Sequence, residues 1–314
     1  MPGGVFCFPD LMTDTLHVPV LLEPILARAA GARRVVDGTL GHGGHAAAFR
    51  AAGAEVLGID RDPDAIATAH ARLGDDGMHY VNAPYASPEA VAAVRAFRPD
   101  FLLLDLGVSS RQLDDESRGF TFRPGAPLDM RMGPDAPPAS EWLASVDEEE
   151  LRRVLRDYGD EPKAKRMAAE IVRRRETAAP RTSDDLVNAI RAALGPRSGP
   201  GDFARIFQAV RIAVNDELEG LEAVLPEFRE ALGPGGTLAV ISYHSGEDRL
   251  VKGAFREWGA GCTCPPGLPQ CICGHVPLGR SEPRKAIIAD DAEIRVNPRA
   301  RSARLRFFRN SDAA

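Results

Sequence analysis

The chain has 314 residues, a hydrophobic fraction of 44%, an aromatic fraction of 6% and a formal net charge of −6. These values are ordinary for a globular protein with room for more than one domain, and the acidic net charge does not by itself indicate nucleic-acid binding. No apolar run is as long as a membrane-spanning helix, and no basic segment followed by an apolar run indicates a secretory signal. We therefore expect a cytoplasmic protein with no membrane partner.

Residues 1–14 precede the first block with a clear pattern, which begins at His17. Chain ends that are not tied to other elements are commonly poorly ordered. We expect residues 1–14 to be a disordered leader, or the result of a start placed too early, with Met12 and not Met1 as the natural first residue.

A glycine-rich turn between two predicted strands is the most informative part of the chain. Apolar residues over 34–36 predict a strand followed by Asp37, and a run over 55–59 predicts a strand followed by Asp60. The carboxyl ends of parallel strands form the ligand-binding edge of an open α/β sheet. The two carboxylates therefore predict a nucleotide-type pocket, in which Asp60 accepts hydrogen bonds from ribose hydroxyls.

The spacing of the glycines in this turn indicates the kind of ligand. Gly41, Gly43 and Gly44 follow neither the GxGxxG pattern of dinucleotide-binding folds nor the P-loop pattern. This spacing favours S-adenosylmethionine over a dinucleotide and makes a dehydrogenase the least favoured class. A helix predicted over 45–52 starts at the turn, and its N-terminal N–H groups would attract the methionine carboxylate of the cofactor.

Strands and helices continue to alternate, which predicts a mostly parallel, doubly wound α/β sheet. Seven strands that end in a late hairpin are typical of the class I methyltransferase variant of this fold. The remaining expected elements are helices over 63–73, 88–97, 217–232 and 247–258, and strands over 79–81, 101–106, 237–242, 286–289 and 304–308.

Three side chains in the loops after later strands are predicted to line the pocket. Asp105 follows four apolar residues, a position that packing explains poorly, and we predict that it is a catalytic residue that faces the transferred methyl group. Tyr85 is predicted to pack on the adenine, although a half-buried surface tyrosine fits the sequence nearly as well. His244 follows the strand over 237–242 and is predicted to contact the substrate.

The aromatic residue that usually follows the catalytic strand in base-directed amino-methyltransferases is missing here, because Asp105 is followed by Leu106 and Gly107. A ring that stacks on the target base must then come from elsewhere. Phe120, Phe122 and Tyr243 are the candidates, although each is also a plausible core residue.

The alternation of strands and helices stops in the middle of the chain. An all-helical stretch of this length inside an α/β chain predicts an inserted domain. We predict that residues 1–113 and 216–314 form the catalytic domain, and that residues 114–215 form a helical domain that recognises the substrate. Its helices are expected over 140–143, 148–157, 163–175, 183–193 and 202–214.

Four cysteines form a compact pattern near the C-terminus: Cys262, Cys264, Cys271 and Cys273. Four thiols this close in sequence are enough to hold one tetrahedral, structural zinc ion. The pattern is two C-x-C pairs and not the more usual C-x2-C, so a reduced loop and a redox-labile disulfide remain alternatives. A zinc ion here would order the loop over 259–279 and would not drive methyl transfer.

Charge is unevenly distributed along the chain. Between Arg280 and Arg309 there are nine Lys or Arg residues and four Asp or Glu residues, a local charge of +5. A basic face on an acidic protein suits binding to an RNA backbone. An Arg-rich strand whose side chains extend over the edge of the core is an equally good interpretation.

Several short blocks occur in order along almost the whole chain, from His17 to about Phe308. They are His17–Pro24, the glycine turn, Leu104–Ser110, Gln112–Asp114, Arg118–Phe120, Pro127–Met132, Phe207–Ile212, Ile241–Ser245, Glu247–Arg249 and Asn297–Ser302. Together these blocks resemble the bacterial 16S ribosomal RNA cytosine-N4 methyltransferases, the MraW/RsmH family.

The resemblance implies S-adenosylmethionine as cofactor and assigns Gly43, Gly44, His45 and Gln112 to binding it. It also implies methylation of the N4 atom of a cytidine in the decoding region of 16S ribosomal RNA, with the small ribosomal subunit as partner. The chain departs from the family pattern at Tyr243, where Phe is usual, and nearby in the same turn.

Two other function classes remain open at this stage. One is a small-molecule or other-RNA methyltransferase, against which the basic tract and the helical insertion argue. The other is a non-enzymatic nucleic-acid-binding regulator that retains the pocket, against which the intact set of carboxylates argues. The sequence does not determine the oligomeric state, and a homodimer is one alternative.

Overall fold

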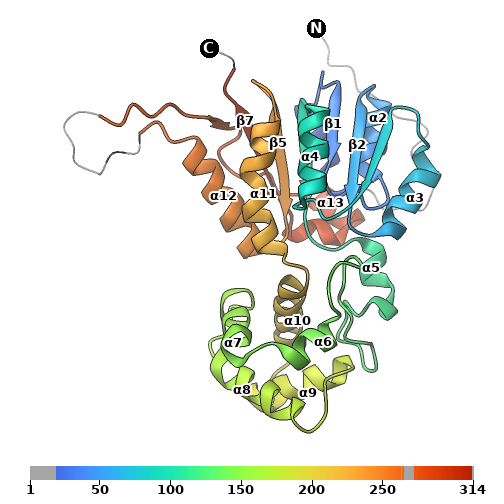
Figure 1. Ribbon diagram of the computed structural model, residues 1–314, viewed down its shortest axis with the longest axis vertical. Coiled ribbons are helices and arrows are strands. Elements are labelled where there is room, and N and C mark those ends of the chain that lie inside the picture. The colour runs from blue at the N-terminus through green and yellow to red at the C-terminus, as the bar shows by residue number, and fades with distance from the viewer. Residues whose placement is uncertain (1–18, 263, 265–271, 313–314) are drawn as a thin grey trace.

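The computed structural model describes residues 19–262, 264 and 272–312, and its main feature is a seven-stranded sheet with the order β3-β2-β1-β4-β5-β7-β6 (Figure 1). The first five strands in this order are parallel to one another. β7 runs antiparallel to both β5 and β6. The predicted class I methyltransferase sheet is therefore confirmed. The strands are β1 (Arg34–Asp37), β2 (Glu55–Asp60), β3 (Met78–Asn82), β4 (Phe101–Asp105), β5 (Thr237–Ser242), β6 (Gly279–Ser281) and β7 (Arg304–Asn310).

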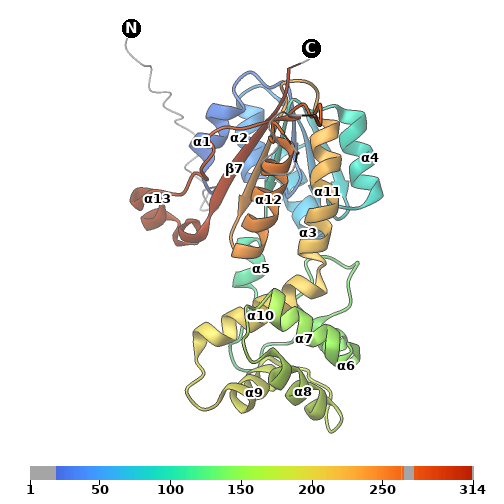
Figure 2. The ribbon, with the colours of Figure 1, turned by 90° about the vertical axis from the view of Figure 1, so that its left-hand side faces the viewer.

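Two layers of helices cover the sheet, one on each face (Figure 2). Strands buried on both faces read as continuous apolar runs. Accordingly, Val35 faces the layer with α1 and α2, whereas Val36 faces the layer with α4, α11 and α12. The helices are α1 (Leu22–Arg28), α2 (Gly44–Ala51), α3 (Pro63–Leu73), α4 (Pro88–Phe97), α11 (Glu217–Ala231), α12 (Ser245–Trp258), α13 (Asp291–Val296) and the short 3-10 helix η2 (Pro298–Ser302).

Local sequence explains where several of these helices begin. Asp62 and Ser87 accept hydrogen bonds from the first-turn N–H groups of α3 and α4, and proline follows each of them at the first helical position. A side-chain acceptor before the helix and proline at its first position both favour helix initiation. The predicted starts of these two helices are therefore correct, and their predicted ends at Leu73 and Phe97 are also correct.

The middle of the chain folds into helices that pack around a hydrophobic cluster of their own. This helical unit lies beyond the carboxyl ends of the strands, and α10 approaches the sheet from below in Figure 1. Its helices are α6 (Ala139–Ser145), α7 (Glu148–Asp157), α8 (Ala164–Arg175), α9 (Ser183–Leu194) and α10 (Pro200–Val214), and the short helices α5 (Ser110–Asp114) and η1 (Glu116–Arg118) lead into it from β4.

The strand predicted over 286–289 is wrong. Within that segment Ile287 pairs with Leu305 only as an isolated bridge, and the strand that pairs with the end of β7 is β6. Pro283 lies between β6 and Ile287 and has no N–H to donate to a ladder. The apolar pair Ile287–Ile288 is also not a strand core, because Ile288 is 63% exposed.

Two further sequence predictions concern the leader over 1–14 and the absence of a membrane-spanning segment. The disordered leader over 1–14 lies outside the described residues and stays a prediction. Among the described residues, no helix combines the length and the apolar character needed to cross a membrane.

Candidate active site at the carboxyl ends of the strands

A cavity of about 640 Å³ lies where the carboxyl ends of the parallel strands meet the helical unit. Its walls come from the glycine turn after β1, from the ends of β2, β4 and β5, and from α10. Of the sequence-predicted site residues, the structure brings Gly44, His45, Asp60, Tyr85, Asp105, Gln112 and His244 to the wall of this cavity. Pockets of this size accept ligands with the dimensions of a nucleoside cofactor.

Asp60 holds the glycine turn in place. Its Oδ2 atom accepts a hydrogen bond from the N–H of Gly41 at 2.8 Å, and its Oδ1 atom accepts one from Asp62 at 2.9 Å. Burial raises the pKa of Asp60 to about 6, even though both hydrogen bonds favour the ionised form. The carboxylate is therefore ionised at neutral pH and lies at the edge of the cavity.

Gly43 and Gly44 shape the start of α2. Gly43 has φ +74°, a left-handed conformation that favours glycine, and its N–H donates to the carbonyl of Leu40 at 2.8 Å. A Cβ atom on Gly44 would lie 2.8 Å from Cγ of Pro19. Gly43 supports the turn from behind, whereas Gly44 is exposed to the cavity.

Asp105 is surrounded by three residues from distant parts of the sequence. Its Oδ1 atom accepts a hydrogen bond from the hydroxyl of Tyr243 at 2.7 Å, and its backbone N–H donates to Oγ1 of Thr39 at 2.6 Å. Its Oδ2 atom lies 3.8 Å from Nδ1 of His45. Burial and the neighbouring carboxylate raise the pKa of Tyr243, so its hydroxyl stays protonated and serves as the donor.

His45 is a buried histidine, 6% exposed, that spans two elements. Its Nε2 atom lies 3.0 Å from the carbonyl oxygen of Val20, and its Nδ1 atom faces Asp105. Burial lowers the pKa of His45, so the ring is neutral at neutral pH. The neutral tautomer that donates from Nε2 to Val20 presents Nδ1 as an acceptor on the side of Asp105.

Asp37 is the most deeply buried of the three strand-end carboxyls, with 1% exposure. Burial raises its pKa to about 6, partly offset by attraction to His45. It supports the loop after β1, because its Oδ1 atom accepts from the N–H of Thr39 at 3.4 Å. Asp37 is not part of the cavity wall, whereas Asp60 and Asp105 are.

Tyr85 and Gln112 both line the cavity, Tyr85 beside the start of α11 and Gln112 beside the start of α3. The Tyr85 hydroxyl lies within 3.4 Å of the Glu217 carbonyl, and burial raises its pKa. Gln112 is 6% exposed; its Oε1 atom accepts from Ser109 at 2.9 Å, and its amide contacts Asp62 at 3.4 Å. Both side chains are held in place by partners that leave them next to the space near Asp60.

His244 occupies the N-cap position of α12, with Nδ1 as acceptor for the N–H of Glu247 at 3.4 Å. The buried carboxylate of Glu247 in turn accepts from the backbone N–H groups of Tyr243 and His244, at 2.7 and 3.2 Å. This reciprocal arrangement is a capping box. His244 borders the cavity while capping the helix, and its contact with a substrate stays a prediction.

Sequence reasoning placed Arg211 and Asn215 on one helix face but missed their partners. Asn215, at the end of α10, accepts from the N–H of Met132 at 2.9 Å and donates to the carbonyl of Met130 at 2.8 Å. Arg211 forms a buried ion pair with Glu217 at 2.8 Å. The sequence signal for Arg211 and Asn215 is their four-residue spacing, which places them on one helix face but does not identify their partners.

Arg61 was also missed. It donates to the backbone carbonyl of Asn215 at 2.9 Å and forms an ion pair with Asp135. Its only sequence signal is its position directly after Asp60. These contacts connect the end of β2 to the loop before α6, on the rim of the cavity.

The three aromatic candidates for base stacking separate in the structure. The ring of Phe122 lies 5.9 Å from that of Phe203 and 6.0 Å from that of Phe207, and Phe120 packs against the same helical cluster. Neither lines the cavity, whereas Tyr243 does. Tyr243 is therefore the one of these three that is placed to touch a ligand.

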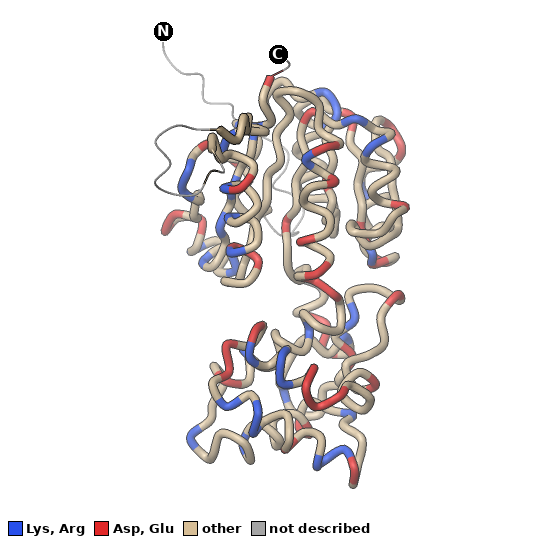
Figure 3. The backbone as a smooth tube through the Cα atoms, turned by 60° about the vertical axis from the view of Figure 1, so that its left-hand side comes forward, with Lys and Arg blue, Asp and Glu red and all other residues tan. Residues whose placement is uncertain are grey.

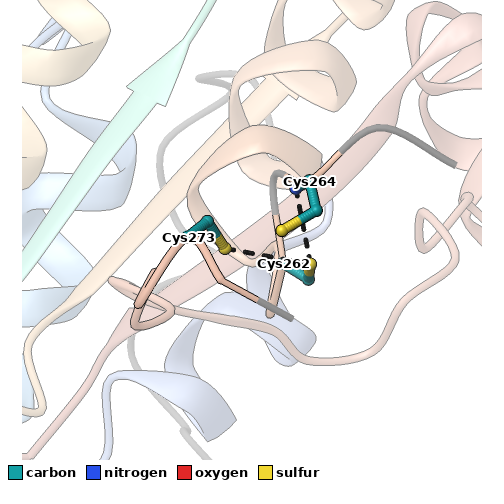
Figure 4. A group of neighbouring side chains, drawn as sticks. All are labelled: Cys262, Cys264 and Cys273. Carbon is teal, nitrogen blue, oxygen red and sulfur yellow. Dashed lines mark hydrogen bonds between the residues drawn. The ribbon is translucent and has the colours of Figure 1, made fainter. Parts of the chain in front are cut away.

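The cysteine cluster is remote from this site. Cys262, Cys264 and Cys273 lie together in the loop after α12 (Figure 4), and Cys271 lies outside the described residues. Because α12 begins at the cavity with its cap His244 and ends at Trp258, the cluster is at the opposite end of this helix.

Ion pairs neutralise part of the basic tract, and the rest is exposed. Acidic partners contact four of its nine basic residues: Arg280, Arg299, Arg306 and Arg309. The other five, Arg284, Lys285, Arg295, Arg301 and Arg304, are exposed, as is the paired Arg280. Figure 3 shows basic and acidic positions interspersed along the backbone. Within the basic tract, Arg299 and Ser302 border the cavity.

Comparison with known proteins identifies the family. The model of the MraW methylase family matches residues 14–311. A ribosomal RNA small subunit methyltransferase H from Gemmatimonas aurantiaca is 58% identical over 308 residues, which is 96% of this chain and 98% of the relative. A relative with the same name from Myxococcus xanthus is 46% identical over 299 residues, which is 94% of this chain and 97% of that protein. The chain therefore belongs to the MraW methylase family.

Proposed function

We propose that this chain transfers a methyl group from S-adenosylmethionine to the exocyclic N4 amine of a cytidine in the decoding region of 16S ribosomal RNA, within the small ribosomal subunit. The observation that carries the proposal is the cavity in which Asp60 and Asp105 end two strands on either side of the glycine turn. The name of the relatives, ribosomal RNA small subunit methyltransferase, supports the substrate class. The family resemblance supports the target atom.

The residues of the cavity fit this cofactor. Asp60 is ionised at neutral pH and would accept both ribose hydroxyls, and the ring of Tyr85 would pack on the adenine. The N-terminal N–H groups of α2, together with Gly43 and Gly44, would hold the methionine carboxylate. Gln112 completes this side of the binding site. When bound, the sulfonium group supplies an activated methyl group, so no metal is needed for the transfer itself.

Asp105 would act on the substrate amine. The N4 amine of cytosine is a poor nucleophile because its lone pair is delocalised, so it must be held in line and its protons must find acceptors. A carboxylate accepts several hydrogen bonds, and Tyr243 occupies only one position on Oδ1. Tyr243 would orient Asp105 through this hydrogen bond, and we propose it as a positioning residue.

The RNA would approach from the side that carries the exposed part of the basic tract. Arg295, Arg301 and Arg304 are exposed and flank Arg299, which borders the cavity. The planar guanidinium groups of arginine suit phosphate oxygens. We further propose that residues 114–215 act as a substrate-recognition domain, because α10 of this unit contributes Gln208 and Arg211 to the cavity wall.

A methyl-transfer assay tests this proposal. Purified protein and labelled S-adenosylmethionine are mixed with small ribosomal subunits that lack the modification, and the digested nucleosides are identified by mass spectrometry. We expect N4-methylcytidine in 16S ribosomal RNA. Cofactor binding without transfer to RNA would overturn the substrate assignment and favour a small-molecule methyltransferase. Absence of cofactor binding would favour a nucleic-acid-binding regulator.

The role of Asp105 is tested by Asp105→Ala in the same assay. We expect transfer to be abolished while the cofactor still binds. Asp76→Ala is the matched control, since Asp76 is an exposed surface aspartate that pairs with Arg50. Near-normal turnover of Asp105→Ala would contradict the assignment.

A further inference from the structure

Three cysteine sulfurs lie close together at the end of α12 (Figure 4). The Sγ atoms of Cys262, Cys264 and Cys273 are all within 4.8 Å of one another, and those of Cys262 and Cys273 are 3.8 Å apart. A disulfide bond would require about 2.05 Å between these two sulfurs. A zinc ion with thiolates at about 2.3 Å in a tetrahedron places neighbouring sulfurs roughly 3.8 Å apart, which matches the observed separation.

The described part of the loop that carries these cysteines has little apolar packing to order it. It leaves α12 at Gly259 and returns at Leu278, whose N–H donates to the carbonyl of Trp258 at 2.8 Å. Within the described part, Ile272 is 79% exposed and Val276 is 72% exposed. Apolar burial therefore does not explain why two cysteines on one arm of this loop meet a third on the other arm. A bound ion does explain it, because metal ligation supplies folding free energy to segments without a core.

We propose that Cys262, Cys264 and Cys273 bind one zinc ion as thiolates and so cross-link the two arms of the loop between α12 and β6. Each thiol releases its proton to solvent on binding, and no oxidation or reduction takes place. Cys271, the fourth cysteine of the sequence pattern, lies outside the described residues, and the proposal rests on the other three.

The ion has a structural role and does not take part in methyl transfer. The 14 residues of α12 separate the cluster from the cavity, and a helix of that length spans about 21 Å. The base of the loop is tied to β7, because Ser311 donates to the carbonyl of Leu278 at 2.9 Å. Zinc would therefore stabilise the sheet edge formed by β6 and β7.

The first test is the metal content of the full-length protein, purified without chelator. We expect about one zinc ion per chain by mass spectrometry of the metal. Cys262→Ser combined with Cys273→Ser should lose the zinc. Cys7→Ser is the matched control, because Cys7 is the one cysteine outside the sequence pattern. This variant should retain its zinc. An absence of zinc that persists after incubation of the reduced protein with zinc would overturn the proposal, as would equal zinc in the double variant.

The second test does not depend on the folding of a variant. Reduced wild-type protein is loaded with Co²⁺, which reports its ligands through its absorption spectrum. Thiolate-to-cobalt charge-transfer bands with intense tetrahedral d–d bands would support the site. A spectrum typical of an octahedral, oxygen-bound ion would overturn it. Removal of zinc by chelator should also lower the Tm of the protein while leaving its affinity for S-adenosylmethionine unchanged within about twofold.

Discussion

Tyr243 donates a hydrogen bond of 2.7 Å to Asp105, although the two residues are 138 positions apart in the chain. The contact joins the ends of two adjacent strands, β4 and β5. It places a protonated hydroxyl against the carboxylate that we propose as the acceptor for the substrate amine. The orientation of Asp105 therefore depends on a residue contributed by the far side of the helical insertion.

Tyr243→Phe removes this hydrogen bond and keeps the ring. A typical hydrogen bond contributes about 0.5–1.5 kcal/mol, so we expect kcat to fall by roughly two- to tenfold while KM for S-adenosylmethionine stays the same. The loss should be partial, since Phe is usual at this position in the family. Steady-state kinetics of Tyr80→Phe provides the control, because the Tyr80 hydroxyl contacts the Gly74 carbonyl on another loop. An unchanged kcat in Tyr243→Phe would show that Asp105 is oriented without this contact.

Cofactor binding should weaken in mild acid. Burial raises the pKa of Asp60 to about 6, so the carboxylate is ionised above this value and becomes protonated as the pH falls through it. A protonated carboxyl is a poorer acceptor for ribose hydroxyls, and we expect Kd for S-adenosylmethionine to rise by up to tenfold per pH unit below about 6. Calorimetric titrations between about pH 7 and pH 5 measure this change.

The control for this prediction is Asp37→Asn. Asp37 also has a pKa raised to about 6 by burial, but it is not part of the cavity wall. The pH dependence of cofactor binding should persist in this variant. If it disappears, Asp37 and not Asp60 is the group whose ionisation controls binding.

Glu217→Ala should strongly destabilise the protein. Glu217 and Arg211 form a buried ion pair at the junction of α10 and α11, with 8% and 15% exposure of their side chains. Removing one partner leaves an unpaired buried charge, which costs about 3–5 kcal/mol of the free energy of unfolding. The double variant Arg211→Met, Glu217→Leu should recover much of this loss. Glu149→Ala, which breaks an exposed pair with Arg152, should change stability by less than about 1 kcal/mol in the same urea unfolding experiments.

Gly119→Ala should be much more destabilising than Gly53→Ala. Both glycines have positive φ, +74° and +88°, so both substitutions carry a backbone cost. A Cβ atom on Gly119 would lie 2.4 Å from the carbonyl oxygen of Pro127, whereas none of the described atoms lies within 4 Å of one on Gly53. We expect a loss of roughly 2–4 kcal/mol for Gly119→Ala and about 1 kcal/mol for Gly53→Ala. Equal losses would show that the loop at Pro127 moves freely.

Several features of this protein follow from the sequence alone, because they depend on local chemistry or on a general rule of sheet geometry. The starts of α3 and α4 follow from their capping residues and prolines. Asp60 and Asp105 could be placed at one edge because parallel strands share the direction of their carboxyl ends. The glycine spacing then indicated the class of cofactor.

Other features were decided only by the tertiary structure. The sequence left Phe122 as a candidate to stack on a base, but packing against Phe203 and Phe207 places it in the helical cluster. It also predicted the wrong segment as the partner of β7, because an apolar pair such as Ile287–Ile288 does not reveal which backbone groups meet a neighbouring strand.

The partners of Asp105 and Asn215 show the physical reason for this division. Tyr243 and Asp105 are far apart in the sequence and meet because β4 and β5 pair in the sheet, and Asn215 meets Met130 across 85 residues. Spacing along the chain determines helix faces and strand ends, because these repeat over a few residues. Contacts between distant segments depend on strand order and on the packing of complete elements, and only the folded molecule specifies them.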